Sequence, residues 1–437
     1  MKKLLLPVLF LVASGKLVAQ NIDKIINPAE VERIEKILSA DDMQGRRTFS
    51  PGIDKAADFI ASEFKKAGLK PVNGASYFQE FSMVRTKFVA ADGTINGTAV
   101  DSKDIVGLTT QPSVSITEKS GYDWVSVGPK DTLFNVVRRL QAAKKNAVVT
   151  VDTSFRRQFN SLKGMRREMF ASDFSIILVL SSEKPSTYAI NFKQEITPMP
   201  LKNVVGILPG KSKKEEYVIF SGHYDHLGIA KPNAAGDSIY NGANDDAAGT
   251  TAVIMLAHYF AQKKDNERTI IFAAFTAEEV GGYGAQYFSR QFKPEQVMAM
   301  FNIEMIGTES KWGPNAAYIT GYDKSSMGEI LQKNLQGSDF TFHPDPYKTQ
   351  NLFYRSDNAT LARLGVPAHT ISTSRMEPDP TAFNKEVDKY YHTLDDEIET
   401  LDMKNMAAII RAIAISSNTI VAGKDTPTRV EAGNLRN

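Results

Sequence analysis

Several chemically reactive side chains follow directly after short apolar runs in the second half of the sequence. They are His223 and Asp225 after one run, Glu278 and Glu279 after another, and Glu304 after a third. Imidazole nitrogens and carboxylate oxygens bind metal ions such as Zn²⁺ and also transfer protons in general acid–base catalysis. The two consecutive glutamates can divide these tasks, because neighbouring side chains at a strand end point in different directions.

Further candidates lie in loops. The adjacent acids Asp245 and Asp246 stand between glycines just before a helical run, and His392 is preceded by tyrosines and followed by acids. Singly, each candidate also has a structural explanation, since acids can cap a helix and a histidine can be a hydrogen-bonded core residue. If His223 binds a metal, its second ring nitrogen needs an acceptor, and Asp225 is suitably spaced to provide one. Their occurrence together in one domain favours a functional site.

Strands and helices alternate in the part of the chain that must position these residues. Apolar runs predict strands at 203–208, 217–221, 269–275, 298–303, 316–320 and 366–372. Helical periodicity predicts helices at 247–262, 283–290, 327–335 and 403–421. This alternation is typical of an α/β sandwich around a largely parallel sheet, in which functional residues collect where strands end.

Two other parts of the chain have different patterns. Residues 28–38 and 55–67 show helical periodicity, with a polar turn at 41–47 between them. From about residue 85 to 199 the sequence changes to short β-like runs. We therefore expect one α/β domain formed by residues 20–84 and 200–424, interrupted by a smaller β-rich domain at 85–199 and followed by a C-terminal tail at 425–437.

Residues 1–19 are typical of a secretory signal peptide. Lys2 and Lys3 give a basic start, Leu4–Ala13 is apolar, and small and polar residues lead to a cleavage site predicted after Ala19. The apolar run is about half as long as a membrane span requires, and no later run is long enough. We therefore expect an exported protein, periplasmic or secreted, with an uncleaved N-terminal anchor as the alternative.

Composition excludes several classes of protein. The 437 residues include no Cys, so disulfides, thiol catalysis and Cys-bound zinc are impossible. The chain has 52 Lys and Arg against 50 Asp and Glu. This near-neutral balance, without a strong basic stripe, argues against nucleic-acid binding. Any bound metal must therefore be held by imidazole nitrogen and by oxygen.

In order and spacing, these motifs resemble those of the M28 zinc aminopeptidases. The family's H-x-D, G-A-N-D-N-A-S-G-like, E-E, N-x-D-M-x-G and Y-H-T-x-x-D motifs are matched at 223–225, 242–249, 278–279, 302–307 and 391–396. A stretch at 38–46 also matches, and the catalytic resemblance covers roughly residues 201–422. It implies a three-layer α/β sandwich with a mixed, largely parallel central sheet, as in zinc-dependent exopeptidases. The insertion at 85–199 would then be a protease-associated-like or lid domain.

The resemblance implies a co-catalytic pair of zinc ions that share one carboxylate. Asp245 would bridge the two ions. Glu279 and His392 would complete one position, and His223 and Glu304 the other. Glu304 stands where the family more commonly has Asp, but its longer side chain also supplies a carboxylate oxygen. Two histidines and three carboxylates suit Zn²⁺, with Co²⁺ or Mn²⁺ as substitutes.

The resemblance also implies roles beside the metals. Glu278 would take a proton from water as general base and deliver it to the leaving amine, without a covalent intermediate. Asp225 and Asp246 would support the ligands, with an unusual peptide bond joining Asp246 to Asp245.

The implied activity is that of an aminopeptidase acting on peptides with a free N-terminus. Arg355, Asp357 and Tyr391 are expected near the substrate, with capping of the following helix as the structural alternative for the segment that holds Asp357. Four histidines have no matching role in the family: His226, His258, His343 and His369.

Three other functions share the fold or part of the motif set. A glutaminyl cyclase uses a single zinc ion, and the presence of all five ligand residues argues against it. A related two-metal carboxypeptidase fits the motif contexts less well. A non-catalytic extracellular binding protein on the same fold would lack a ligand or the general base, and none is missing here.

Overall fold

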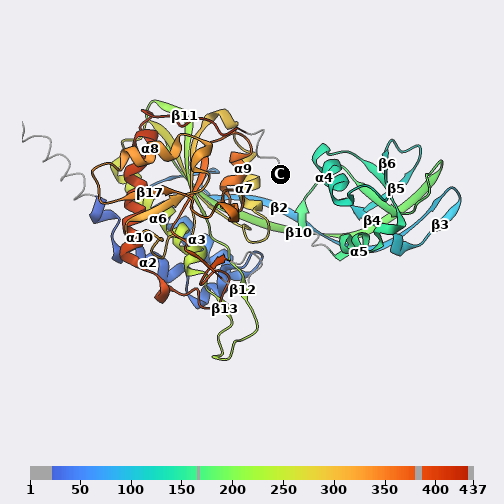
Figure 1. Ribbon diagram of the computed structural model, residues 1–437, viewed down its shortest axis with the longest axis horizontal. Coiled ribbons are helices and arrows are strands. Elements are labelled where there is room, and N and C mark those ends of the chain that lie inside the picture. Colours follow the sequence, from blue (N-terminus) through green and yellow to red (C-terminus); the bar gives the residue numbers. More distant parts are fainter. Residues whose placement is uncertain (1–21, 165–167, 379–385, 432–437) are drawn as a thin grey trace, which may run out of the picture. The chain divides into compact units, whose positions relative to one another are not determined.

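The computed structural model describes residues 22–164, 168–378 and 386–431. The predicted signal peptide, residues 1–19, lies outside the described residues. The chain divides into a larger unit, Met1–Glu80 with Leu201–Asn437, and a smaller unit, Phe81–Pro200. It passes between the two within the long strands β2 (Phe78–Ile95) and β10 (Tyr188–Leu208) (Figure 1). The domain boundaries predicted after residues 84 and 199 lie close to this division.

The larger unit is built on a mixed sheet. Its strands are ordered β17 (Thr341–Pro344), β16 (Ala316–Ile319), β18 (Ala368–Ser372), β15 (Val297–Ile303), β11 (Lys213–His223), β14 (Arg268–Phe275) and the C-terminal part of β10, with β1 (Lys70–Pro71) also paired to β10. The strands from β18 to β14 are parallel to one another, whereas β16 and β10 run antiparallel to their neighbours β18 and β14. The predicted mixed, largely parallel sheet is confirmed.

Helices cover both faces of this sheet. One face packs against α2 (Pro28–Leu38), α3 (Pro51–Lys66), α6 (Ala248–Lys263), α8 (Met327–Asn334) and α10 (Met403–Ser416), which α11 (Asn418–Val421) follows. The other face packs against α7 (Tyr283–Ser289) and α9 (Asn358–Ala362). The predicted three-layer α/β sandwich is therefore confirmed.

Burial dictates the composition of the central elements. Every residue of β14 is buried, because a parallel strand with helices on both faces has no solvent-facing side. Helix α6 is buried almost all round, since α2, α3 and α10 also pack against it. By contrast, α2 lies at the surface, and its first turn is set by Pro28 and by the Asn27 side chain, which accepts a hydrogen bond from the Glu30 N–H.

The smaller unit is a β-rich sandwich. One sheet has the order β4 (Ile105–Leu108), β9 (Ile176–Leu180), β7 (Ala147–Val151) and β6 (Asp123–Val127). One of its faces packs against α4 (Leu133–Ala143) and α5 (Arg156–Gly164). Its other face packs against β2, β10 and β5 (Ser113–Thr117), whose sheet also includes β3 (Thr98–Val100) and β8 (Glu168–Phe170).

The end of the described chain packs against the larger unit. Arg429 donates hydrogen bonds to the carbonyls of Val297 and Pro294, and Val430 is buried beside α9 and β15. The segment predicted as a tail is thus part of this unit as far as residue 431. Among the described residues, no helix combines the length and apolarity needed to cross a membrane.

A buried arginine joins the N-terminal segment to two loops of the sheet. Arg46 ends the 3₁₀ segment Asp41–Arg46 and is inaccessible to solvent. It donates hydrogen bonds to the backbone carbonyls of Leu38 (2.7 Å), Tyr224 (2.9 Å), Asn241 (2.6 Å) and Gly242 (2.8 Å). Tyr224 follows β11, and Asn241 and Gly242 precede α6. Arg46 therefore fixes the loops after β11 and before α6 relative to each other.

Replacement of this arginine tests the importance of the link. We expect Arg46→Met to lower the free energy of unfolding by about 3 to 5 kcal/mol, because it leaves several buried carbonyls without donors. Chemical denaturation followed by circular dichroism measures the change. Arg47→Met is the matched control, since Arg47 is exposed; equal stability of the two variants would contradict the assigned role.

Candidate metal centre

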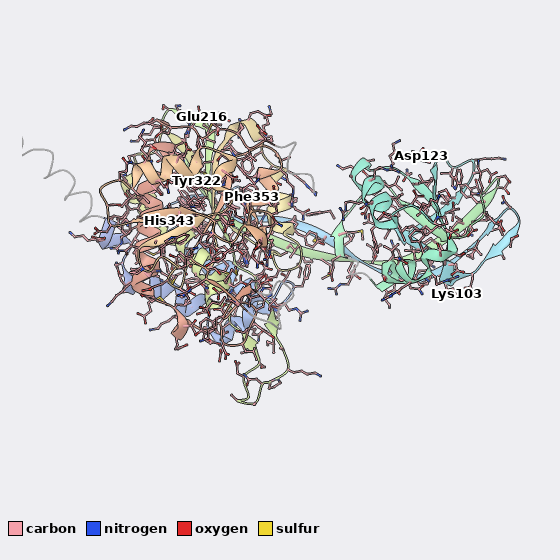
Figure 2. All side chains as sticks on the ribbon, in the orientation of Figure 1. Lys103, Asp123, Glu216, Tyr322, His343 and Phe353 are labelled. Carbon is pink, nitrogen blue, oxygen red and sulfur yellow. The ribbon has the colours of Figure 1, made fainter. Side chains whose placement is uncertain are left out.

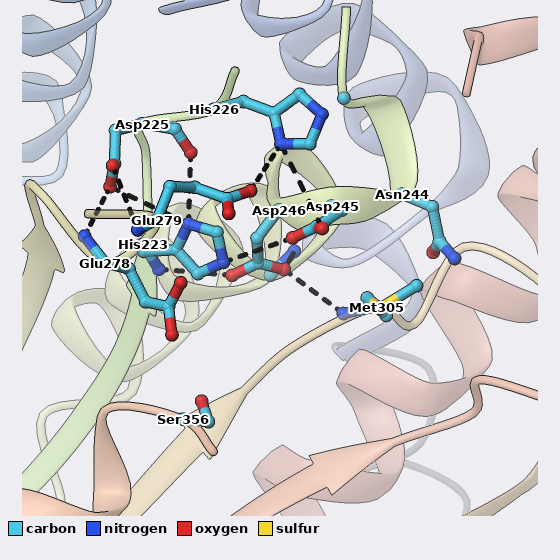
Figure 3. A network of polar contacts seen from close by, with 12 residues as sticks. His223, Asp225, His226, Asn244, Asp245, Asp246, Glu278, Glu279, Met305 and Ser356 are labelled. Carbon is cyan, nitrogen blue, oxygen red and sulfur yellow. Dashed lines mark hydrogen bonds and ion pairs between the residues drawn. The ribbon is translucent and has the colours of Figure 1, made fainter. Parts of the chain in front are cut away.

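The carboxyl ends of the parallel strands converge on one group of polar side chains (Figure 3). These side chains come from the ends of β11, β14 and β15, from the loop before α6, and from the loop after β20 (Glu386–Asp388); they are His223, Glu278, Glu279, Glu304, Asp245 and His392. The structure thus brings together the five predicted metal ligands and the predicted general base.

Asp245 lies between two imidazoles. Its Oδ1 is 3.2 Å from His223 Nε2, and its Oδ2 is 3.3 Å from His392 Nε2. His392 Nε2 is also 3.1 Å from Glu279 Oε2. Each oxygen of Asp245 therefore faces a different histidine, as a carboxylate shared between two cations would.

Unpartnered atoms indicate that the group is suited to bind ions. His223 Nε2 and Asp245 Oδ2 are buried and have no hydrogen-bond partner among the described residues. Ligating atoms of His223, Asp245 and Glu304 lie within 4.8 Å of one another, and so do those of His226, Asp245 and Glu279. Buried polar atoms normally have a partner, and these nitrogen and oxygen donors match the preferences of Zn²⁺.

Asp225 supports the site differently from the way its spacing suggested. His223 Nδ1 lies 3.0 Å from the backbone carbonyl of Asp225, but 3.8 Å from its carboxylate. The carboxylate instead accepts hydrogen bonds from the N–H groups of Glu278 and Glu279 and from the Thr48 hydroxyl. A His223 ring that donates from Nδ1 leaves Nε2 free for a metal, so the backbone, not the acid, orients this ring.

Asp246 fixes the ends of three elements. Its carboxylate accepts hydrogen bonds from the N–H groups of His223 (3.1 Å), Gly249 (2.9 Å) and Met305 (3.1 Å). Gly249 must lack a side chain, because a Cβ there would lie 2.3 Å from an Asp246 oxygen. The peptide bond between Asp245 and Asp246 is cis, which matches the unusual bond that the resemblance implied.

Asp396 is a further supporting residue that sequence reasoning placed in a motif without a role. Its carboxylate accepts hydrogen bonds from the backbone N–H groups of Asn244 (2.8 Å) and Asp245 (3.0 Å). Burial raises its pKa to about 6. The last acid of the motif at 391–396 therefore holds the backbone that carries the shared carboxylate.

The acids of the site are crowded in a buried place. Burial raises the pKa of Glu278 well above its ordinary value, and the charges of Asp357, Glu304 and Glu279 raise it further. Burial also raises the pKa of Glu304, and that of Asp357 to about 8. So many carboxylates need either protons or cations to neutralise them, and bound metal ions would provide the latter.

Two cavities adjoin the centre. The first, of about 180 Å³, is lined in part by Asp245, Glu278, Glu304 and His392. The rest of its lining is mainly apolar or hydroxyl-bearing, with two charged residues, and consists of Met305, Tyr318, Thr320, Leu352, Arg355, Ser356, Thr370, Ser372, Ser374, Met376, Val387, Asp388 and Tyr391. The second, of about 450 Å³, extends from Glu278 and Glu279 along α7 and α9.

The three residues expected near the substrate line these cavities. Arg355 and Tyr391 line both, and Asp357 lines the second. Tyr391 stacks on His392, with ring centroids 3.8 Å apart. Asp357 is buried, but its carboxylate makes no capping hydrogen bond to α9 and has no partner among the described residues. The alternative that this carboxylate caps the helix is therefore not observed.

Of the four histidines without a predicted role, three have structural partners elsewhere. His258 lies 3.1 Å from Glu63 Oε2, and His369 contacts Ser325 and the Thr320 carbonyl. His343, which is in β17 and is labelled in Figure 2, stacks on Trp312. His226 is different, because its Nδ1 lies 2.8 Å from Glu279 Oε1 inside the centre. Its position three residues after His223 was the available signal, but the family motif assigns it nothing.

Comparisons with known proteins agree with this arrangement. Residues 203–416 match peptidase family M28. A probable zinc metalloprotease of Leptosphaeria maculans is 27% identical over 205 residues, which are 44% of this chain and 47% of that protein. Leucine aminopeptidase 1 of Pyrenophora tritici-repentis is 25% identical over 293 residues, covering 63% of this chain and 69% of that protein. The chain thus spans less than half the length of the metalloprotease.

Solved structures share the fold. An aminopeptidase from Aneurinibacillus sp. strain AM-1 superposes with a TM-score of 0.52 at 16% identity, covering 92% of this chain and 95% of that one. A zinc aminopeptidase from Bacillus subtilis also gives a TM-score of 0.52 at 16% identity, covering 91% and 95%. With its sequence match over the region that carries the site, the chain belongs to peptidase family M28.

Proposed function

We propose that this protein is a metal-dependent aminopeptidase with a co-catalytic pair of zinc ions. His223, Glu304 and one oxygen of Asp245 would hold one ion, and Glu279, His392 and the other oxygen of Asp245 would hold the second. The observation that carries the proposal is the placement of Asp245, with each carboxylate oxygen directed at a different histidine.

Glu278 is the residue best placed to move protons. It follows β14, lines both cavities and belongs to neither group of clustered ligands. Bound divalent ions would supply Lewis acidity, polarising the scissile carbonyl and making water a stronger acid. Glu278 would accept the proton from that water and pass it to the leaving amine. A carboxylate whose pKa is raised by burial is suited to both steps.

The chemistry of the proposed centre favours a substrate with a free amino terminus. Asp245, Glu278 and Glu304 all line the first cavity. The free α-amine of a peptide could meet a metal ion held there and the nearby carboxylates, whereas a blocked N-terminus offers no free amine. A relative named leucine aminopeptidase 1 is consistent with removal of N-terminal residues.

The first cavity would receive the N-terminal side chain. Beyond the metal centre its walls are apolar at Met305, Leu352 and Met376. The Ser374 hydroxyl in this lining donates a hydrogen bond to Asp388. Asp388 also accepts two backbone N–H groups, so this acid is already hydrogen-bonded, and an uncharged side chain would fit the walls formed by Met305, Leu352 and Met376 best.

Hydrolysis of matched free and N-acetylated peptides tests the proposed activity. We expect peptides with a free N-terminus to be cleaved at least ten times faster, and a chelator to abolish cleavage until Zn²⁺ is restored. Release of the N-terminal residue is measured by chromatography. Equal cleavage of blocked and free peptides would contradict aminopeptidase activity, and activity that persists after metal removal would contradict the metal mechanism.

The role of Glu278 is tested by an isosteric change. We expect Glu278→Gln to bind metal normally but to lower kcat by about 100-fold or more, because the amide cannot accept the proton. Turnover and metal content are measured on the same sample. Glu215→Gln is the matched control at an exposed position. Unchanged turnover, or loss of metal in the Glu278 variant, would remove it as general base.

The assignment of the first cavity is tested by filling it. We expect Leu352→Trp to lower kcat/KM for peptides with N-terminal Leu by about tenfold or more while largely sparing N-terminal Ala, since the larger ring occupies space that only the longer side chain needs. Leu364→Trp, at an exposed position outside the cavity lining, is the control. An equal loss for both substrates would contradict the assignment.

A further inference from the structure

His226 lies inside the metal centre although no motif assigns it a role. Its side chain is buried, and it comes from the loop after β11, three residues beyond His223. Figure 3 shows its ring directed toward Glu279 and Asp245. The nearest carboxylate atom is Glu279 Oε1, 2.8 Å from His226 Nδ1.

The two oxygens of Glu279 face different imidazoles. Oε1 is 2.8 Å from His226 Nδ1, whereas Oε2 is 3.1 Å from His392 Nε2. His392 also lies 3.3 Å from Asp245 Oδ2, whereas His226 Nδ1 is 4.0 Å from that atom. The oxygen of Glu279 that faces His392 is therefore the one available to a cation shared with Asp245.

The distances separate a ligand from a hydrogen-bond donor. Metal–ligand bonds of about 2.0–2.1 Å in a tetrahedral zinc site place neighbouring ligand atoms about 3.3 Å apart. His392 matches this spacing toward both Glu279 and Asp245. His226 does not, because it is at hydrogen-bond distance from Glu279 and too far from Asp245.

We propose that His226 is a positioning residue for the metal centre: it donates a hydrogen bond from Nδ1 to Glu279 Oε1 and thereby holds Oε2 toward the metal that His392 also binds. This inference rests on the proposed two-metal function. Hydrogen-bond partners of metal ligands fix ligand orientation and typically contribute 10- to 100-fold to metal affinity. The two metal positions are then unequal, since only the one with Glu279 depends on this histidine.

The surroundings hold the His226 ring in the orientation that this bond needs. Its backbone N–H bonds to the Arg46 carbonyl, and the ring packs edge-on against Tyr240. A Cβ at Gly242 would lie 2.5 Å from the ring carbons, so glycine is required there. The other ring nitrogen, Nε2, is buried and has no hydrogen-bond partner among the described residues. With the proton on Nδ1, Nε2 carries no N–H group that would need an acceptor.

Zinc titration of the metal-free full chain tests the inference. We expect the wild type to bind two equivalents, and His226→Leu to weaken one of them by about 10- to 100-fold while leaving the other unchanged. His226→Asn should stay within a few-fold of wild type, because its amide nitrogen also stands at the δ position and can donate to Glu279. Competition with a chelating indicator measures both affinities without an activity assay.

His258→Leu is the matched control, since it removes a histidine that contacts a buried glutamate, Glu63, outside the centre. If His226→Leu does not fold, His226→Gln is titrated in its place. The amide nitrogen of Gln lies one bond farther along the side chain than Nδ1 of His226, so we expect it to lose the hydrogen bond to Glu279 as well. The visible spectrum of the Co²⁺-loaded protein should be the same in wild type and His226→Asn, as expected when no ligand is exchanged.

Three outcomes would overturn the inference. Unchanged zinc affinities in a folded His226→Leu variant would show that the bond is not needed. Equal losses in the Asn and Leu variants, with an altered Co²⁺ spectrum, would make His226 a ligand. A wild type that binds fewer than two equivalents would overturn the two-metal proposal itself, and this result is distinguishable because it does not involve the variants.

Discussion

Crowding of buried carboxylates is the constraint on which the centre depends. Asp225, Asp245, Asp246 and Asp357 are all nearly inaccessible to water and lie around the same strand ends. Removing several like charges from water is costly unless each is hydrogen-bonded, protonated or paired with a cation. The parallel sheet makes the arrangement feasible, because its strand ends and the start of α6 present backbone N–H groups to the acids. The fold thus supplies donors to some carboxylates and leaves the others for cations.

This division separates supporting acids from reactive ones. Asp225, Asp246 and Asp396 each accept two or more backbone N–H groups, and they fix the segments that carry the proposed ligands. Asp245 accepts no such bond at Oδ2 and faces imidazoles instead. No described residue donates a hydrogen bond to the Glu278 carboxylate, and burial raises its pKa. The adjacent acids Asp245 and Asp246 therefore have different roles, because backbone N–H groups donate hydrogen bonds to Asp246 but not to Oδ2 of Asp245.

Apolar runs predicted the central strands of the sheet and most of its covering helices, because burial on both faces imposes continuous apolar strands, and strand ends located most of the site. The edge strand β17 was not predicted, since it is short and only Phe342 in it is buried. Boundaries were less predictable. The helix expected at 403–421 is interrupted at Ser417, where serine hydroxyls bond to the preceding helical carbonyls. Contacts between distant segments could not be predicted from spacing. Arg46 binds carbonyls, Asp225 holds the backbone of the two glutamates, and His226 reaches Glu279, all because of loop conformations that side-chain types do not specify.

The links made by Arg46 also bear on the order in which the molecule can be assembled. Its bonds to Tyr224 and Gly242 join positions separated by 178 and 196 residues. Closing such long loops costs conformational entropy before the contacts that stabilise them can form. Contacts between residues far apart in the sequence therefore slow folding. During synthesis, Arg46 cannot make all of these bonds until residue 242 has been added. The proposed set of metal ligands is incomplete until His392 has been added. Topology alone therefore delays a complete centre until residue 392 has been added, so a chain that lacks this residue cannot hydrolyse peptides by the proposed mechanism.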